Sequence, residues 1–264
     1  MTPVAGPPKP LKREYVLEAL ESVDKRAVLV GGQAVAWWAE YYGVRGRLPA
    51  IDDPTAMYIS KDADFAARSL DPRKLRPVVK EVAARLHGAP HFKFPFTSLV
   101  AASVTFTDDE GEERTVEFLK GVHGIRGRDR VLDEAVGFEA TADLPSFYVM
   151  HPVMLLESRA ANVVELDGYQ TETAILQARI ARDVLREWHL DQLADGWEEA
   201  RQGIERTLKL AEHERGVTIA AKHDVDVLAA VPSDHQALPL RFLEKRLEPC
   251  REKVAAAIAA ARAS

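Results

Sequence analysis

The sequence predicts an α/β protein in which a domain with a small mixed sheet precedes a helical domain. Before residue 145, short apolar runs of strand length alternate with helical patterns and with turns rich in glycine or proline. After residue 145, long helical patterns follow one another with few strand signals between them. We therefore expect an α/β domain at residues 1–145, which begins with a flexible arm at residues 1–10, and a helical domain at residues 146–264.

The first domain is expected to open with a strand, two glycines and a helix. A helix is predicted before this unit, over residues 11–23, because apolar residues recur there at helical spacing. Residues 27–30 are apolar throughout and too short for a helix, so they predict a buried strand. Two glycines end this run, and residues 33–42 regain a helical pattern that Gly43 is expected to stop.

The rest of the first domain offers further strand candidates around one helix. Residues 44–56 lose all periodicity and are rich in glycine, proline and aspartate, which predicts a surface loop. Extended structure is expected at residues 57–66, followed by a helix over residues 72–86. Residues 98–107 and 114–119 predict a hairpin, because acidic residues and a glycine separate two strand-like runs.

A loop and four helical segments are expected after this hairpin. The loop, residues 121–130, contains Arg126, Arg128 and Arg130, which suit either a solvated surface or contact with phosphate or RNA. The expected helices cover residues 149–166, 170–188, 190–215 and 235–261. The helical half therefore adds no predicted strand to the sheet.

Composition and charge exclude several classes of protein. A hydrophobic content of 47% and a charged content of 29% are typical of a soluble globular protein, and a net charge of −6 argues against a generally basic nucleic-acid-binding surface. Cys250 is the only cysteine, so an intrachain disulfide and a cysteine-rich zinc site are excluded. No apolar run reaches the roughly 20 residues of a membrane helix. We therefore expect no membrane partner and a cytoplasmic location.

The pair Gly31-Gly32 has two interpretations. A tight turn between a strand and a helix needs glycine for conformational reasons alone. Glycines at the start of a helix also let backbone N–H groups approach phosphate oxygens, and the helix N-terminus favours negative charge there. The carboxylates that follow in the sequence favour the second interpretation.

Two aspartates in the segment Ser-Lys-Asp-Ala-Asp-Phe form the strongest candidate for a metal site. On a strand, Asp62 and Asp64 project to the same face, and paired carboxylates suit Mg²⁺, which prefers oxygen ligands. Glu117, on a separate predicted strand, offers a third carboxylate if the two strands are neighbours. The same spacing recurs at Asp224 and Asp226, in the helical half, where it predicts only a solvated turn.

The segments Val-Gly-Gly-Gln-Ala and Ser-Lys-Asp-Ala-Asp-Phe resemble the polymerase-beta-type nucleotidyltransferase superfamily, and most closely the abortive-infection-type nucleotidyltransferases that act as toxins of toxin–antitoxin pairs. The resemblance implies that Gly31 and Gly32 hold nucleotide phosphates, with Ser60 as a polar partner. It also implies that Asp62 and Asp64 bind two Mg²⁺ ions. Glu117 would complete the metal site and deprotonate the acceptor.

A weaker part of the resemblance lies in the helical half. The segment His-Pro-Val-Met-Leu-Leu-Glu-Ser-Arg is similar to a family helix that carries a basic residue towards the nucleotide, which here is Arg159. Arginine binds phosphate bidentately and suits this role. A cation on the helix surface is the other interpretation of Arg159.

The resemblance implies a Mg²⁺-dependent enzyme that transfers a nucleoside monophosphate from an NTP to a hydroxyl acceptor. The acceptor is tRNA or another RNA, a protein or a small molecule, and an antitoxin protein is the implied partner. Two other classes stay open at this point. One is a non-catalytic module that keeps the fold and binds a nucleotide or a partner, and the other is a structural α/β protein in which Asp62 and Asp64 are only solvated.

Overall fold

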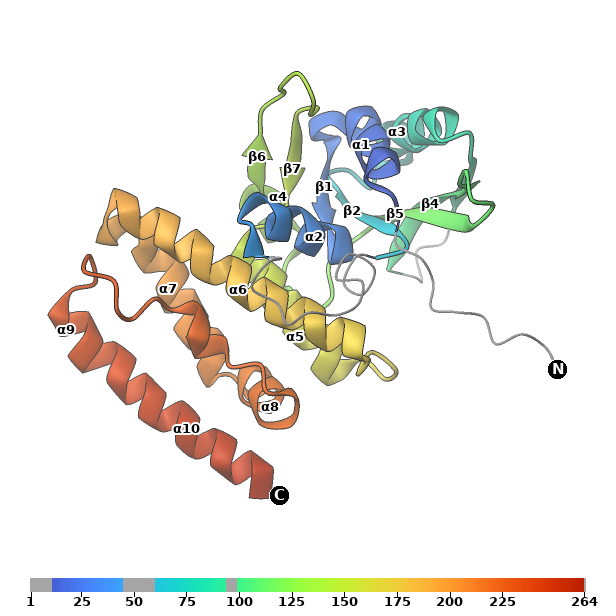
Figure 1. The fold of residues 1–264 in the computed structure, drawn as a ribbon. Helices are drawn as coiled ribbons and strands as arrows, with labels where there is room; N and C mark the ends of the chain where they lie inside the picture. The colour runs from blue at the N-terminus through green and yellow to red at the C-terminus, as the bar shows by residue number, and fades with distance from the viewer. Residues whose placement is uncertain (1–10, 45–59, 94–98, 264) are drawn as a thin grey trace. The chain divides into compact units, whose positions relative to one another are not determined.

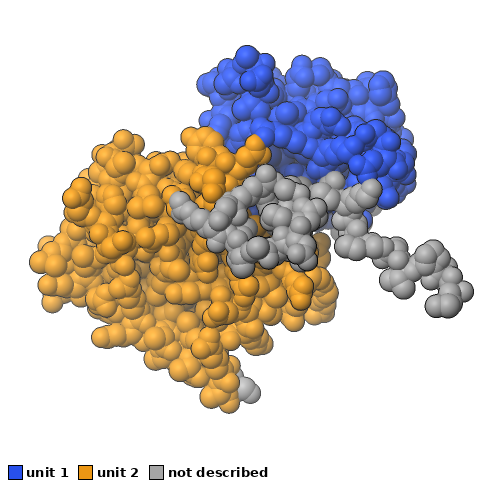
Figure 2. All heavy atoms as spheres, in the orientation of Figure 1, with its two compact units in different colours: residues 1–37, 49–151 blue, residues 38–48, 152–264 orange. Residues whose placement is uncertain are grey.

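The computed structural model describes residues 11–44, 60–93 and 99–263. The chain divides into two compact units, which Figure 2 shows in different colours. The first, which we call the sheet unit, contains residues 1–37 and 49–151, and the second, the helical unit, contains residues 38–48 and 152–264.

The division between the units falls after His151, a few residues beyond the domain boundary predicted at residue 145. The segment between these two positions contains a strand, Phe147–Val149, whose partner in the sheet lies near the start of the chain. The predicted arm at residues 1–10 and loop at residues 44–56 fall outside the described residues, apart from Val44.

The sheet unit contains one sheet of seven strands in the order β3-β4-β5-β2-β1-β7-β6. The strands are β1 (Ala27–Val30), β2 (Ala63–Ala67), β3 (Ala89–Phe92), β4 (Val100–Thr107), β5 (Glu113–Leu119), β6 (Val136–Phe138) and β7 (Phe147–Val149). Two pairs are parallel, β2 with β5 and β1 with β7, and the other pairs are antiparallel. The sheet is therefore mixed, as the sequence predicts.

Four helices belong wholly or partly to the sheet unit. They are α1 (Arg13–Val23), the first part of α2 (Gly31–Tyr41), α3 (Pro72–Arg85) and α4 (Arg128–Asp133). The helices α1 and α3 lie side by side (Figure 1), and α3 packs on β3 and β4. Asp71 caps α3 by accepting a hydrogen bond from the Arg73 N–H, and Pro72 occupies the first helical position, where its missing N–H costs nothing.

The alternation of side chains along the central strands fixes the two faces of the sheet. Phe65 of β2 and Phe118 of β5 are neighbours in register, are fully buried, and stack with ring centroids 5.8 Å apart. Residues one position away point to the opposite face, which is where Asp64 and Glu117 lie. Burial of the two aromatic rings thus determines which face presents the carboxylates.

Three strands have no counterpart in the sequence prediction. The strand β3 is mostly exposed and contains Pro90, so no alternation of apolar residues marks it. The strands β6 and β7 have three residues each and pair antiparallel with one another. Such short strands are defined by their partners rather than by a pattern of their own.

The helical unit contains the helices α5 (Pro152–Glu165), α6 (Glu172–Asp195), α7 (Trp197–Glu212), α8 (Glu214–His223), the short α9 (Leu240–Phe242) and α10 (Glu248–Ala263). Within this unit α5 packs along α6, and α10 packs against α8 and α7. The break predicted before Leu190 lies at Gly196 instead, where φ is +124°. None of the helices in the described parts of the chain is long and apolar enough to cross a membrane.

Candidate functional site

The turn from β1 into α2 brings Gly31 against Asp64. The helix begins at Gly31 itself, two residues earlier than predicted, and Gly31 has φ +69°. A Cβ atom at this position would lie 2.2 Å from Asp64 Oδ2, far below any real contact distance. Glycine is therefore required here for two reasons, the left-handed backbone and the close approach of a carboxylate. This approach places the Asp64 carboxylate beside the N-terminus of α2, where the helix dipole favours negative charge.

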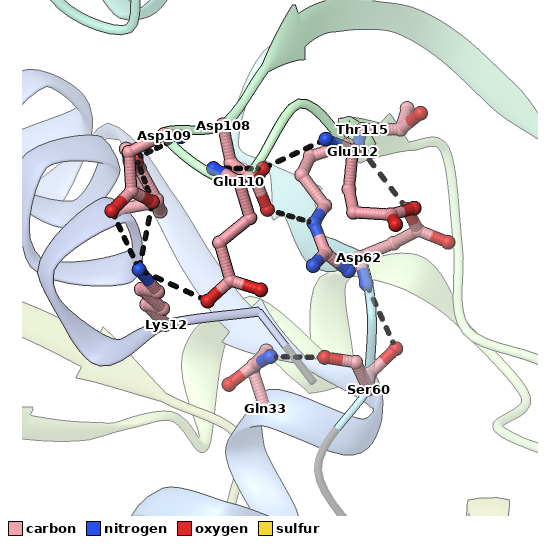
Figure 3. Close-up of polar contacts among 11 residues, drawn as sticks. Lys12, Gln33, Ser60, Asp62, Asp108, Asp109, Glu110, Glu112 and Thr115 are labelled. Carbon is pink, nitrogen blue, oxygen red and sulfur yellow. Dashed lines mark hydrogen bonds and ion pairs between the residues drawn. The ribbon is translucent and has the colours of Figure 1, made fainter. Parts of the chain in front are cut away.

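Asp62 is held by the strand beside it. Its Oδ1 accepts a hydrogen bond from the backbone N–H of Thr115 in β5, with a donor–acceptor distance of 3.2 Å. Its own backbone N–H donates to Ser60 Oγ at 3.3 Å (Figure 3). Asp62 is half-buried, so its carboxylate has a fixed neighbour on one side and access to solvent on the other.

Glu117 lies in register with Asp64, because β2 and β5 run parallel and pair residue for residue. Residues that pair in register project to the same face of a sheet, so Asp64 and Glu117 share one face. Asp62 lies one residue before β2 begins, so it has no register partner, and its position is given by its hydrogen bond from the Thr115 N–H of β5. Two of the three predicted carboxylates thus share a face on adjacent strands, and the third lies at the entrance to β2.

The protonation equilibria of two of these carboxylates reflect their surroundings. Burial raises the pKa of Asp62 above its ordinary value, opposed by the charge of Lys61 and by the hydrogen bond from Thr115. Burial also raises the pKa of Glu117, the charge of Lys93 opposes this, and the charge of Asp62 raises it further. The anionic forms of Asp62 and Glu117 therefore disfavour each other, and a bound cation would relieve that repulsion.

The donor set suits a hard divalent cation, because carboxylate oxygens are the ligands Mg²⁺ prefers. Within residues 11–44, 60–93 and 99–263, however, no three histidine, cysteine, aspartate or glutamate side chains are grouped closely enough to hold a metal ion as they stand. The carboxylates thus have the right chemistry, and binding of a cation would require side-chain rotation to bring their oxygens together.

Gln33 is a site residue that the sequence analysis did not single out. It is 5% exposed, and its Nε2 donates a hydrogen bond of 2.8 Å to the backbone oxygen of Ser60. The same oxygen accepts a hydrogen bond from the Leu11 N–H. Gln33 therefore ties the start of α2 to the segment that leads into Asp62 (Figure 3). A polar residue on an otherwise apolar helix, directly after the diglycine, is the signal that identifies it.

A buried ion pair anchors the strand that binds Asp62. Arg114 Nε donates to Asp108 Oδ2 at 2.7 Å, and their side chains are 3% and 1% exposed. Asp108 also accepts hydrogen bonds from the N–H groups of Glu110 and Glu112, which closes the turn between β4 and β5. Burial alone would raise the pKa of Asp108, but these hydrogen bonds and Arg114 hold it below its ordinary value. The pair fixes the start of β5, immediately before Thr115.

The turn between β4 and β5 is also fastened to α1 (Figure 3). Lys12 Nζ contacts Asp109 Oδ2 at 2.6 Å and Glu110 Oε1 at 3.2 Å. The Tyr15 hydroxyl donates to Asp109 Oδ1 and accepts from the Asp109 N–H, both at 3.0 Å. These contacts connect the hairpin to the first helix and leave it no independent freedom.

The arginines that the sequence offers as phosphate contacts, Arg128, Arg130 and Arg159, form hydrogen bonds or ion pairs within the protein. Arg159 lies on α5 in the helical unit, where its Nη1 donates to Gln177 Oε1 at 3.1 Å. Arg128 donates to the backbone oxygens of Ala67 and Arg68, so it stabilises the end of β2. Arg130 forms an ion pair with Glu134 one helical turn later. Arg128 and Arg130 belong to α4 rather than to a loop, and their contacts are structural.

The second Asp-x-Asp segment lies in a turn, as the sequence predicts. Asp224 ends α8 with φ +57°, and its side chain is 90% exposed. Asp226 precedes a 3₁₀ helix (Val227–Ala230) and accepts a hydrogen bond of 2.9 Å from the Leu228 N–H. Between them Val225 is fully buried. Both aspartates therefore act at helix ends.

Comparison of the sequence with models of known protein families finds no match, and comparison with curated proteins finds none either.

Proposed function

We propose that this protein is a Mg²⁺-dependent nucleotidyltransferase, which transfers a nucleoside monophosphate from an NTP to a hydroxyl group. One observation carries the proposal: the Asp64 carboxylate touches the position of Gly31 at the start of α2, Glu117 pairs in register with Asp64, and Asp62 lies just before β2 against the Thr115 N–H. The helix start that we propose to bind phosphate is therefore adjacent to the carboxylates that we propose to bind the metal. A nucleoside triphosphate with bound Mg²⁺ needs both at once.

In this proposal Gly31 and Gly32 bind the phosphates through backbone N–H groups, and Ser60 is the further phosphate contact suggested by the sequence. Asp62, Asp64 and Glu117 would hold Mg²⁺, which would neutralise charge on the triphosphate.

The acceptor oxygen forms a bond to the α-phosphorus, and the bond between the α-phosphorus and the bridging oxygen breaks to release pyrophosphate. Glu117 takes the proton of the acceptor hydroxyl.

The test is transfer of label from each of the four NTPs in the presence of Mg²⁺, with total tRNA as the first acceptor and the protein itself as the second. We expect transfer by the wild type and none by the double variant Asp62→Ala plus Asp64→Ala. The matched control is Asp224→Ala plus Asp226→Ala, which removes the same residue types at the same spacing and should keep the activity. Equal transfer by all three proteins would exclude the mechanism.

A non-catalytic nucleotide-binding module is a second candidate, favoured by the separation of the carboxylates in the described residues. Such a module would gain thermal stability from an NTP with Mg²⁺, because a ligand that binds only the folded state raises the free energy of unfolding. It would transfer label to neither tRNA, nor itself, nor a hydroxyl-bearing antibiotic. A melting-temperature shift without transfer to any of these acceptors would therefore support the module.

A further inference from the structure

A cavity lies at the end of β1 and β2 that is opposite to the carboxylates. Its volume is about 520 Å³, and it opens where β1 begins and β2 ends, at the register pair Ala27 and Ala67. The carboxylate site lies at the other end of this strand pair, where Val30 pairs with Asp64. The cavity and the carboxylates therefore occupy different ends of the sheet and share no residue.

The lining of this cavity combines positive charge with an apolar floor. Among its described lining residues, four are cationic, one is a serine, five are apolar and none is acidic. The cations are Lys25, Arg26, Arg68 and Lys74, and the apolar residues are Ala27, Ala67, Leu75, Val78 and Phe118. The apolar residues belong to the buried core, so the floor is rigid. Cations without an acidic counterpart in the lining favour an anionic occupant.

Two of the cations are already neutralised from outside the cavity. Arg26 contacts Glu81 at 2.7 Å, and Lys25 contacts Glu139 at 3.0 Å, and neither glutamate lines the cavity. These ion pairs orient the two side chains and leave part of their hydrogen-bonding capacity unused, since lysine has three donors and arginine five.

The other two cations carry charge that no acidic side chain of the cavity lining balances. The guanidinium of Arg68 lies over the Tyr148 ring, 4.6 Å from its centroid, which fixes the orientation of its plane. Lys74 lies in the first turn of α3, where its charge lowers the pKa of Asp71, whose ion pair is with Arg73. Its charge adds to the positive end of the α3 dipole at the cavity mouth.

We propose that this cavity binds a small organic phosphate, a phosphomonoester with an apolar body. A phosphomonoester carries nearly two negative charges, and the planar donors of arginine match its oxygens. The apolar body would lie against the side of the cavity that Leu75 and Val78 line. A volume of about 520 Å³ lies in the range of small-molecule sites. The proposal does not depend on nucleotidyl transfer, because it uses none of the carboxylate residues.

Isothermal titration calorimetry with three probes tests the proposal: phenyl phosphate, inorganic phosphate and phenol, all in EDTA. We expect phenyl phosphate to bind roughly tenfold more tightly than inorganic phosphate, because its ring buries apolar area, and phenol not to bind measurably. Absence of heat with phenyl phosphate at millimolar concentration would overturn the proposal. EDTA excludes a contribution from a magnesium site, so this result is independent of the proposed enzyme activity.

Two charge-reversal variants on α3 test whether phenyl phosphate binds in this cavity. Lys74→Glu should weaken the binding of phenyl phosphate roughly tenfold, since it replaces attraction by repulsion at the cavity mouth. Lys80→Glu, on the exposed side of α3 and outside the cavity lining, should change the affinity less than about twofold. Both side chains are exposed, so both variants should fold, which circular dichroism checks. Equal weakening by the two variants would overturn the site.

The variant Asp62→Ala plus Asp64→Ala should bind phenyl phosphate as the wild type does. Loss of binding in this variant would instead assign the phosphate to the carboxylate end. A ten-nucleotide single-stranded RNA serves as the competitor. The proposal of a small-molecule site is wrong if two results occur together. The RNA would displace phenyl phosphate, and Lys80→Glu would weaken RNA binding as much as Lys74→Glu does, which would show that the surface binds a polyanion.

Discussion

The chain contains the same acidic pattern twice, as Asp62-Ala63-Asp64 and as Asp224-Val225-Asp226, and the structure uses the two copies differently. The first copy leads into and begins the central strand β2, and its carboxylates meet the Thr115 N–H of β5 and the Gly31 turn. The second copy is a turn between two helices of the helical unit. The spacing of two aspartates in the sequence therefore does not identify a metal site by itself. The backbone conformation and the neighbouring groups decide what the carboxylates can bind.

The two Asp-x-Asp segments also differ in the electrostatic surroundings of their carboxylates. Burial raises the pKa of Asp62. Asp224, in contrast, is 90% exposed, and its Oδ1 lies 3.8 Å from Arg262 Nη2. A half-buried carboxylate near a second one retains an affinity for cations that a fully hydrated carboxylate lacks. Four experiments test whether this difference is real, from the largest expected effect to the smallest.

The buried ion pair that fixes β5 beside Asp62 has no counterpart around Asp224. We expect Asp108→Asn to lower the free energy of unfolding by about 3–5 kcal/mol, because it leaves the buried Arg114 without its counter-charge. Urea denaturation measures the change. The double variant Asp108→Asn plus Arg114→Met should be less destabilised than the single one, since no buried charge remains unpaired. A single variant within 1 kcal/mol of wild type, a threshold of roughly the uncertainty of such measurements, would contradict the anchoring role.

The same substitution, aspartate to asparagine, at Asp62 and at Asp224 tests whether only the first segment takes part in the proposed catalysis. We expect Asp62→Asn to reduce nucleotidyl transfer about 100- to 1,000-fold, equivalent to about 3–4 kcal/mol in the barrier, because it removes one charged group from the reacting centre. Asp224→Asn should leave the rate within a factor of about two. Initial rates at saturating NTP measure both. A similar loss in the two variants would remove the distinction on which the proposed function depends.

A comparison of Gly31 with Gly43 distinguishes the effect of backbone conformation on stability from the effect of the contact with Asp64. Gly31 and Gly43 both have positive φ, +69° and +62°, but a Cβ at Gly43 would meet nothing within 4 Å. We expect Gly31→Ala to lower the free energy of unfolding by about 2–3 kcal/mol and Gly43→Ala by about 1–2 kcal/mol, the difference being the displacement of Asp64. Thermal unfolding measures both. If the two variants are equally destabilised, the close approach of Asp64 is not energetically significant.

The second copy should contribute only to its turn. We expect Asp226→Ala to destabilise the protein by about 1 kcal/mol, because the Leu228 N–H loses the side chain that caps the 3₁₀ helix. Asp226→Asn, which keeps an acceptor oxygen, should cost less. Neither variant should alter the stabilisation of the wild type by Mg²⁺ and NTP, followed by melting temperature. A reduced response in Asp226→Ala would indicate that the turn takes part in ligand binding.

The sequence alone predicts the local features that have a pattern of their own. The strand at residues 27–30 and the helix capped by Asp71 are confirmed within a residue, because apolar runs and capping residues act over a few positions. The interpretation of Asp224 and Asp226 as a turn is confirmed for the same reason. The strands β6 and β7 escaped prediction, since each has only three residues and is stabilised by its partner.

The contacts of Arg128 could not be predicted from the sequence. In the sequence it belongs to an arginine-rich loop that suits phosphate or solvent, but in the structure it donates to the backbone oxygens at the end of β2. Its partners are about 60 residues away. No local pattern encodes such a contact, and the same holds for the cavity lined by Lys25 and Lys74.

The sequence by itself determined that two glycines follow a buried strand and that Asp64 points to the opposite side of its strand from the buried Phe65. Only the tertiary structure decided that β2 and β5 pair in parallel with Asp64 opposite Glu117, and that Asp64 touches Gly31. The physical reason is register. A slip of β5 by one residue would turn Phe118 out of the core and Glu117 to the other face, so burial of Phe118 against Phe65 selects the arrangement.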